Sequence, residues 1–210
     1  MSDGKVHYTN RKKRKYWLHK RFSKKGTPCY YFSAKQNKER LVDEVPDGWV
    51  IWEHPESFQP FLRKVMPRVI SLEEEELIQH YLEESPHVDE FMVDVRGSQV
   101  TIYAAERVEP ISQRLSKLFG RDVTKDLDDD ALLKMLQGEF AQQVFFAQPC
   151  VASLRFTLVD EEKRLFSTER WCCRGSIDDW IDLPNSGSLK SVCEALVPHI
   201  GQESFYDLSW

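Results

Sequence analysis

The sequence predicts an α+β protein in which antiparallel sheets, built from hairpins, pack with four to five helices. Segments that alternate apolar and polar side chains are joined by short turns, as between residues 91–95 and 100–104. Other segments repeat apolar residues at helical spacing, as in the stretch after Ser71. Strands and helices do not alternate regularly, which favours hairpins over the crossover connections of a parallel sheet.

The distribution of charge predicts how the chain is organised. Residues 1–40 contain 13 Lys/Arg and two acidic residues, although the 210 residues together carry a net charge of −5. This asymmetry indicates a basic segment attached to an acidic body. We expect a basic, flexible arm over residues 1–25, a small β-rich section over 26–68, and an α+β section over 69–210 that can share one core with the section before it.

One hairpin is specified in detail by its pattern. A two-residue turn at Gly97-Ser98 places Val95 opposite Val100, Val93 opposite Ile102 and Phe91 opposite Ala104. Every apolar side chain then lies on one face, so the turn and the alternation agree on the register. Further strands are predicted at residues 29–33, 49–53, 61–66 and 151–159.

Helices are predicted from capping residues and apolar periodicity. Ser71 and Glu74 have the spacing of a capping box, which marks the start of the clearest helix. Leu189 begins the apolar stripe of a last helix. Two more helices are expected at about residues 110–119 and 128–136.

The stretch from Ser167 to Leu183 is the most unusual part of the sequence. It reads as the end of a strand, a turn at Gly175 and a helix capped by Ser176, whose first turn contains two aspartates. Trp171 and Trp180 are expected to be buried wedges. We interpret the stretch as mainly architectural.

The basic segment is the best candidate for a binding site. Lys and Arg neutralise phosphates and release counterions, while aromatic rings offer stacking faces to unpaired bases. The favoured partner is RNA or DNA, single-stranded in particular; an anionic protein or anionic lipid fits the same pattern. The predicted nucleic-acid-binding residues are Arg11, Lys12, Lys13, Arg14, Lys15, Tyr16, Trp17, Lys20, Arg21, Phe22, Lys24 and Lys25.

An enzyme is the alternative. Cys172 or Cys173 would supply the nucleophile, activated by Arg170 or Arg174 and by a helix N-terminus, with His54 or His199 as base. Buried cysteine behaves as a small hydrophobic residue, however, so we expect packing rather than catalysis at these positions.

No metal or cofactor is predicted. Asp126, Asp128 and Asp130 have the alternate spacing of a calcium loop, but Ala131 stands where the loop needs glycine and Gln137 where it needs glutamate. We favour an acidic helix N-terminus, which explains these aspartates without a metal.

The remaining sequence features concern environment and assembly. Five cysteines without a C-x-x-C pair, no apolar run of about 20 residues and no apolar signal segment lead us to expect a cytoplasmic protein without a membrane span. The aromatic C-terminal tail, ending in Trp210, is a candidate homodimer contact. The sequence therefore favours a non-enzymatic cytoplasmic binding protein, with an enzyme or a protein-interaction or structural module as alternatives.

Overall fold

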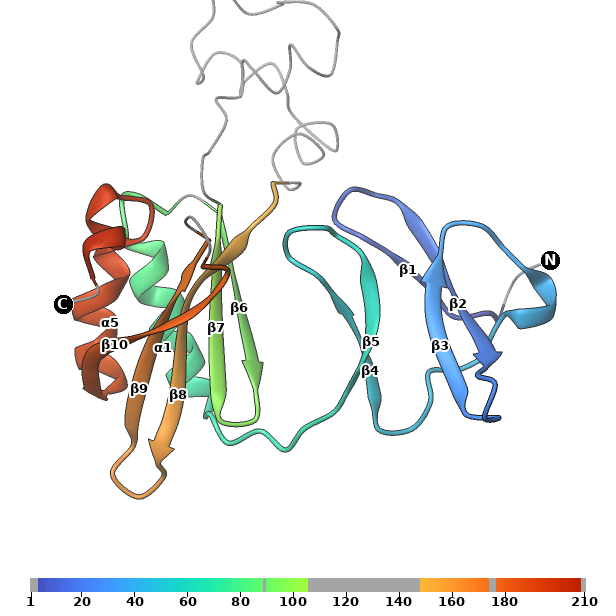
Figure 1. Ribbon diagram of the computed structural model, residues 1–210, viewed down its shortest axis with the longest axis horizontal. Coiled ribbons are helices and arrows are strands. Elements are labelled where there is room, and N and C mark those ends of the chain that lie inside the picture. The colour runs from blue at the N-terminus through green and yellow to red at the C-terminus, as the bar shows by residue number, and fades with distance from the viewer. Residues whose placement is uncertain (1–3, 89, 106–147, 174–176, 209–210) are drawn as a thin grey trace, which may run out of the picture. The chain divides into compact units, whose positions relative to one another are not determined.

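The computed structural model describes residues 4–88, 90–105, 148–173 and 177–208, and the chain divides into two compact units (Figure 1). Of the described residues, 4–65 and 148–149 belong to the first unit, and 66–88, 90–105, 150–173 and 177–208 belong to the second. In the part of the chain that the structure describes, all strand pairings are antiparallel.

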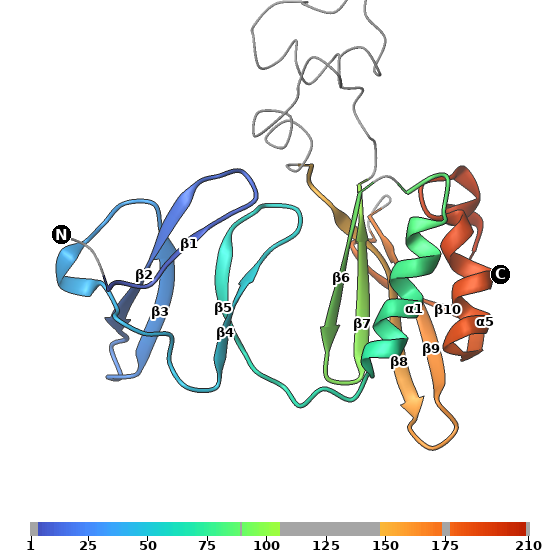
Figure 2. The ribbon, with the colours of Figure 1, turned by 180° about the vertical axis from the view of Figure 1, so that it is seen from behind.

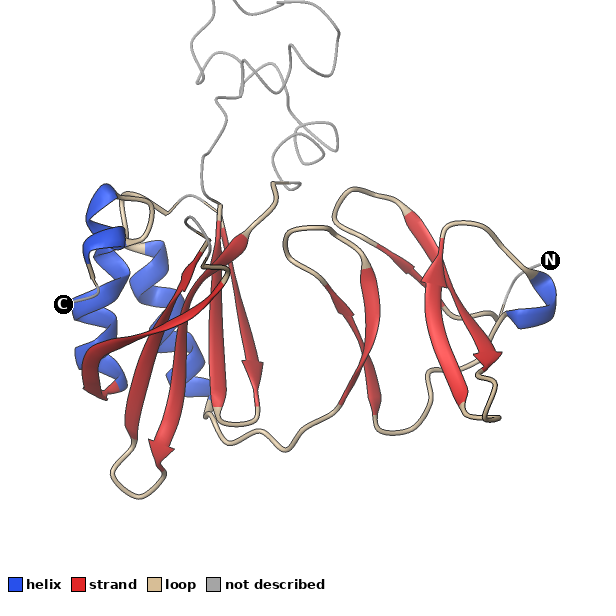
Figure 3. Cartoon of the chain, viewed as in Figure 1, coloured by secondary structure: helices blue, strands red, loops and turns tan. Residues whose placement is uncertain are grey.

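The described part of the first unit is built from short strands in two sheets. One sheet has the order β1-β2-β3, and a separate hairpin pairs β4 with β5 (Figure 3). A short 3₁₀ helix, η1, follows β3. The bounds are β1 (His7–Thr9), β2 (Lys15–Phe22), β3 (Pro28–Ser33), η1 (Lys38–Arg40), β4 (Trp49–Glu53) and β5 (Pro60–Lys64).

The basic segment forms the centre of the three-stranded sheet. β2 pairs with β1 on one edge and with β3 on the other, so that Leu18 lies opposite Phe32 and His19 opposite Tyr31. Leu18, Phe32 and Trp17 are buried. The sheet therefore extends on both sides of residue 25, where we place the boundary between the basic arm and the β-rich section.

The second unit is a five-stranded sheet covered by helices on one face. The strand order is β10-β9-β8-β7-β6, and α1 and α5 lie on the same side of it (Figures 1 and 2). Apolar residues from both helices and from the covered face form one core. The bounds are α1 (Leu72–Glu83), β6 (Phe91–Arg96), β7 (Gln99–Ala104), β8 (Val151–Asp160), β9 (Leu165–Cys172), β10 (Asp179–Ser188), α5 (Leu189–Leu196), η2 (Val197–His199) and η3 (Glu203–Asp207).

The predicted register of the β6–β7 hairpin is confirmed. Val95 pairs with Val100, Val93 with Ile102 and Phe91 with Ala104. Gly97 has φ +60°, the left-handed conformation that the tight turn requires and that glycine adopts without strain.

The capping box at α1 is also confirmed, and its glutamate forms an additional ion pair. The Ser71 hydroxyl accepts a hydrogen bond from the Glu74 backbone N–H, and the Glu74 carboxylate accepts one from the Ser71 backbone N–H. The same carboxylate accepts from the Arg164 guanidinium, with 2.9 Å between Nε and Oε1. This ion pair ties the start of α1 to the β8–β9 turn.

The predicted number of helices is wrong. The described residues contain two α-helices, α1 and α5, beside three antiparallel sheets, instead of four to five packed helices. The helices predicted near 110–119 and 128–136 lie outside the described residues, as do the calcium-like aspartates at 126–130. Neither α1 nor α5 is long and apolar enough to cross a membrane.

The helix predicted from Ser176 is also wrong. Residues 179–188 form β10, which pairs with β9 and places Trp180 opposite Trp171. Serine and aspartate favour turns as well as helix caps, and Trp180-Ile181 has good strand propensity, so the local pattern is consistent with both structures. The cap observed next in the chain is Ser188, whose hydroxyl accepts from the Ser191 backbone N–H at the start of α5.

Candidate nucleic-acid interface

The predicted basic residues separate into two groups at opposite ends of β2. The turn cluster, between β1 and β2, consists of Lys12, Lys13, Arg14 and Lys15. The hairpin cluster, at the end of β2 and in the loop to β3, consists of Lys20, Arg21, Phe22, Lys24 and Lys25. Their nearest members, Lys15 and Lys20, lie five residues apart on β2, which is roughly 17 Å at about 3.3 Å per residue.

Arg11 belongs to neither cluster because it supports the fold. Its Nε donates to Glu53 Oε1 at 2.8 Å, and its Nη2 donates to the Pro55 carbonyl at 2.7 Å. Glu53 is only 6% exposed, so Arg11 neutralises a buried carboxylate. Burial and the same carboxylate raise the pKa of Tyr8.

Trp17 is likewise structural. It is 6% exposed, with its ring centroid 5.2 Å from that of His7 and the Lys15 ammonium 4.4 Å from its ring. Tyr16 is half-buried. The predicted stacking role therefore has support in the structure mainly at Phe22.

The hairpin cluster combines exposed positive charge with an exposed ring. Phe22 is 65% exposed, and the Lys20 ammonium lies 5.2 Å from its ring centroid and 5.9 Å from that of Tyr30. On the other face of the sheet, Arg21 lies 5.7 Å from the Tyr31 ring. Aromatic faces thus hold both cations while leaving them charged.

The loop after β2 carries the other two cations of the hairpin cluster. Ser23 and Thr27 close this loop through a backbone hydrogen bond of 2.9 Å, and Gly26 takes the left-handed conformation with φ +77°. Lys24 and Lys25 are exposed at its tip. Within the described ranges no carboxylate forms an ion pair with Lys20, Arg21, Lys24 or Lys25.

His19 connects β2 to the loop that follows β3, next to the hairpin cluster. It is 1% exposed; its Nδ1 donates to the Trp17 carbonyl at 2.8 Å, and its Nε2 accepts from the Asn37 backbone N–H at 3.1 Å. These partners require the neutral ring with the proton on Nδ1. Stacking on Tyr31, with centroids 5.1 Å apart, completes its packing.

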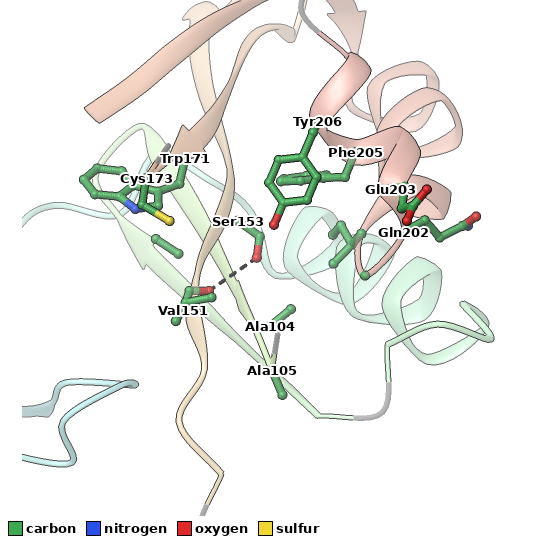
Figure 4. A pocket seen from close by; sticks show the side chains of 13 residues that line it. Ala104, Ala105, Val151, Ser153, Trp171, Cys173, Gln202, Glu203, Phe205 and Tyr206 are labelled. Carbon is green, nitrogen blue, oxygen red and sulfur yellow. Dashed lines mark hydrogen bonds between the residues drawn. The ribbon is translucent and has the colours of Figure 1, made fainter. Parts of the chain in front are cut away.

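The second unit contains a cavity of about 220 Å³ at one end of its sheet (Figure 4). Its walls include Ser153 and Trp171 from the strands and residues from the η3 segment. Cys173, the exposed one of the two predicted nucleophiles, also lines it. The lining residues with polar or aromatic side chains include Ser153, Trp171, Cys173, Glu203, Phe205 and Tyr206.

The cavity does not assemble the predicted catalytic set. Cys172 is buried, and no histidine lines the cavity among the residues described. His199 Nδ1 is 2.8 Å from the Ser204 hydroxyl, and His54 Nδ1 faces the backbone N–H of Glu56 at 3.3 Å. His199, the proposed base in the same unit as Cys173, is therefore bound to Ser204 and does not line the cavity with that thiol.

Arg170 is buried, and its guanidinium reaches the η3 segment. It is 5% exposed; its Nη2 donates to the Tyr206 carbonyl at 3.3 Å, whereas Nε and Nη1 have no partner in the described part of the chain.

The two tryptophans of this region are half-buried instead of forming core wedges. Trp171 and Trp180 meet edge to face with centroids 5.3 Å apart. The Arg155 guanidinium, which pairs with Glu169, lies 4.3 Å from the Trp180 ring. The cluster supports the architectural interpretation of this stretch through surface stacking.

Within the described residues, no group of three or more His, Cys, Asp or Glu side chains is arranged to hold a metal ion.

Comparison with known proteins gives no assignment: no protein family, curated protein or solved structure matches the chain significantly.

Sequence reasoning missed Tyr30 and Tyr31 as parts of this candidate interface. Tyr30 and Tyr31 lie on the strand predicted at residues 29–33. Pairing that strand with residues 17–22 across the Gly26 loop would have placed both rings beside Lys20 and Arg21, as the observed register does. The spacing of the two segments around Gly26 therefore indicated this hairpin, but we did not predict it because we interpreted the basic segment as a flexible arm.

Proposed function

We propose that the chain binds nucleic acid through the hairpin cluster on its N-terminal sheet. The supporting observation is that four exposed or half-exposed cations, Lys20, Arg21, Lys24 and Lys25, have no carboxylate partner in the described residues. Cations that are not neutralised within a protein attract a polyanion by releasing its counterions.

The acidic residues in the rest of the chain restrict where a nucleic acid can bind. The residues after position 40 carry more acidic than basic side chains, so they repel a phosphate backbone. Binding is then confined to the N-terminal sheet. Backbone contacts of this kind give affinity without sequence specificity.

A matched pair of double variants tests the location of the site. Lys24→Gln/Lys25→Gln removes two charges from the hairpin cluster, and Lys163→Gln/Lys190→Gln removes two exposed lysine charges from the second unit. We expect the first variant to weaken binding of a fluorescein-labelled 20-nucleotide strand in fluorescence anisotropy at low salt by about 10-fold, because two phosphate contacts are lost. The second variant should bind like the wild type.

Two results would contradict the proposal. One is an equal loss of affinity for the labelled strand in both double variants, which would indicate that binding depends only on net charge. The other is an absence of nucleic-acid binding by the wild type, in which case an anionic protein becomes the better candidate partner.

The enzyme alternative is favoured only by the exposure of Cys173 at the cavity in the second unit. Fast alkylation of Cys173 alone does not support it, because an exposed thiol is accessible in either case. An enzyme would need Cys173→Ser to abolish a turnover that the wild type shows.

A further inference from the structure

A hollow of about 330 Å³ borders the exposed ring of the hairpin cluster. Lys20 and Phe22 line it on the β2 side, and residues 39–44 line it on the other. The hollow is within the size range of small-molecule sites, which begins at about 300 Å³. It is therefore large enough to receive one planar ring beside Phe22.

The far wall of this hollow is fixed to β2. The Val42 backbone N–H donates to the Leu18 carbonyl at 3.2 Å, and Leu41 forms an isolated bridge with His19. The Asn37 N–H is bound to the His19 ring, as described above. Because these contacts hold residues 37–42 against the strand, the hollow exists before any ligand arrives.

Phe22 supplies the apolar surface of the hollow. At 65% exposure it is the most exposed of the large apolar side chains in the described residues. An exposed aromatic ring beside a lysine is the arrangement on which single-stranded nucleic acid stacks its bases.

The charges around the hollow are mixed, which determines what it can accept. Lys20 and Arg40 are positive, while Glu39 and Glu44 are negative, and Asp43 is paired with Lys5 at 2.5 Å. Two carboxylates disfavour a phosphate inside the hollow. A neutral ring with N–H groups at its edge suits both, because carboxylates accept hydrogen bonds from base amino groups.

We propose that the hollow receives one unpaired nucleobase, stacked on Phe22, while the phosphates beside that base contact the lysines of the hairpin cluster. The inference rests on the proposed function and specifies its substrate as single-stranded. A base within a duplex is stacked on both sides and paired at its edge, so it cannot enter.

The test compares labelled single strands and duplexes of the same sequence on intact protein. Wild type binds the single strand more tightly than the duplex. Stacking of one base contributes about 5- to 150-fold in affinity, so Phe22→Leu weakens single-strand binding by at least about 5-fold and leaves duplex binding unchanged. Phe22→Trp retains the single-strand preference because it keeps an aromatic face.

Phe61→Leu is the matched control, since Phe61 is another exposed phenylalanine, 47% exposed, on β5. It should bind both nucleic acids as the wild type does. Thermal unfolding of each variant confirms that the fold is retained, as expected for an exposed position.

The outcomes separate this inference from the proposed function. Two results overturn the nucleobase site while leaving the polyanion interface in place. One is that the wild type binds single strand and duplex with equal affinity. The other is that Phe22→Leu changes neither affinity, or lowers both by the same factor. Absence of binding to either nucleic acid overturns both. Tighter binding to an acidic protein than to the single strand also overturns the base site.

Discussion

Single residues in this chain take roles that depend on burial, which the sequence does not specify. Arg11 and Lys12 are adjacent and both basic, yet Arg11 neutralises the buried Glu53 whereas Lys12 is exposed over the Phe58 ring. Cys172 and Cys173 are also adjacent, and only Cys172 is buried. The basic composition could be predicted, but distinguishing structural from available cations required knowing that Glu53 of β4 lies beside Arg11 in the β1–β2 turn.

Cys193 provides a prediction at this scale. The thiol is fully buried in the core of the second unit, and burial, together with the Glu194 carboxylate, raises its pKa from 9.0 to about 12. Below about pH 9 both folded and unfolded states keep the proton, so its contribution to stability is complete. Above that pH the unfolded state loses the proton first, and stability falls until the pH reaches about 12.

Urea unfolding across the alkaline range measures this effect. We expect the wild type to lose up to about 1.4 kcal/mol per pH unit above pH 9 through this group. In Cys193→Ala the free energy of unfolding should fall less steeply with pH, because the thiol is absent. This variant starts from a lower stability because the substitution leaves a cavity. Parallel curves for the two proteins would show that Cys193 ionises alike in both states.

Elements were predictable where two local signals agreed. The β6–β7 register followed from a turn and an alternation that point to the same pairing, and the start of α1 followed from a capping box. The stretch at 176–179 failed because serine and aspartate fit a helix cap and a turn equally, and only pairing with β9 decides the outcome. The strand at residues 29–33 was predicted, but its pairing with β2 was missed because the basic residues before it were interpreted as a flexible arm.

The β6–β7 hairpin allows a direct stability prediction. Val93 packs against the core of the second unit, whereas Val159, near the end of β8, is 62% exposed. Val93→Asp places a carboxylate against apolar side chains, so it should destabilise the protein by about 2–3 kcal/mol more than Val159→Asp does. Chemical denaturation of the two variants makes the comparison, and equal losses would be inconsistent with the core packing described for Val93.

At the scale of the whole molecule, charge is segregated along the chain. The N-terminal sheet carries cations without carboxylate partners in the described residues, while the remainder of the sequence is acidic. This segregation was visible in the sequence and led to the polyanion hypothesis. Phe22 was predicted as a stacking residue, but the hollow that we propose as a base site was not predicted, because Phe22 and residues 39–44 come together only when β2 pairs with its neighbours.

The salt dependence of binding tests the central claim most directly. Anisotropy with a labelled single strand, repeated over a range of salt concentrations, gives a slope of log affinity against log salt of about 0.7 per phosphate contact. We predict a linear fall for the wild type and a slope smaller by about 2–3 when Lys20, Arg21, Lys24 and Lys25 are all replaced by Gln. An unchanged slope in that variant would contradict the account, because the phosphates would then be bound elsewhere on the chain.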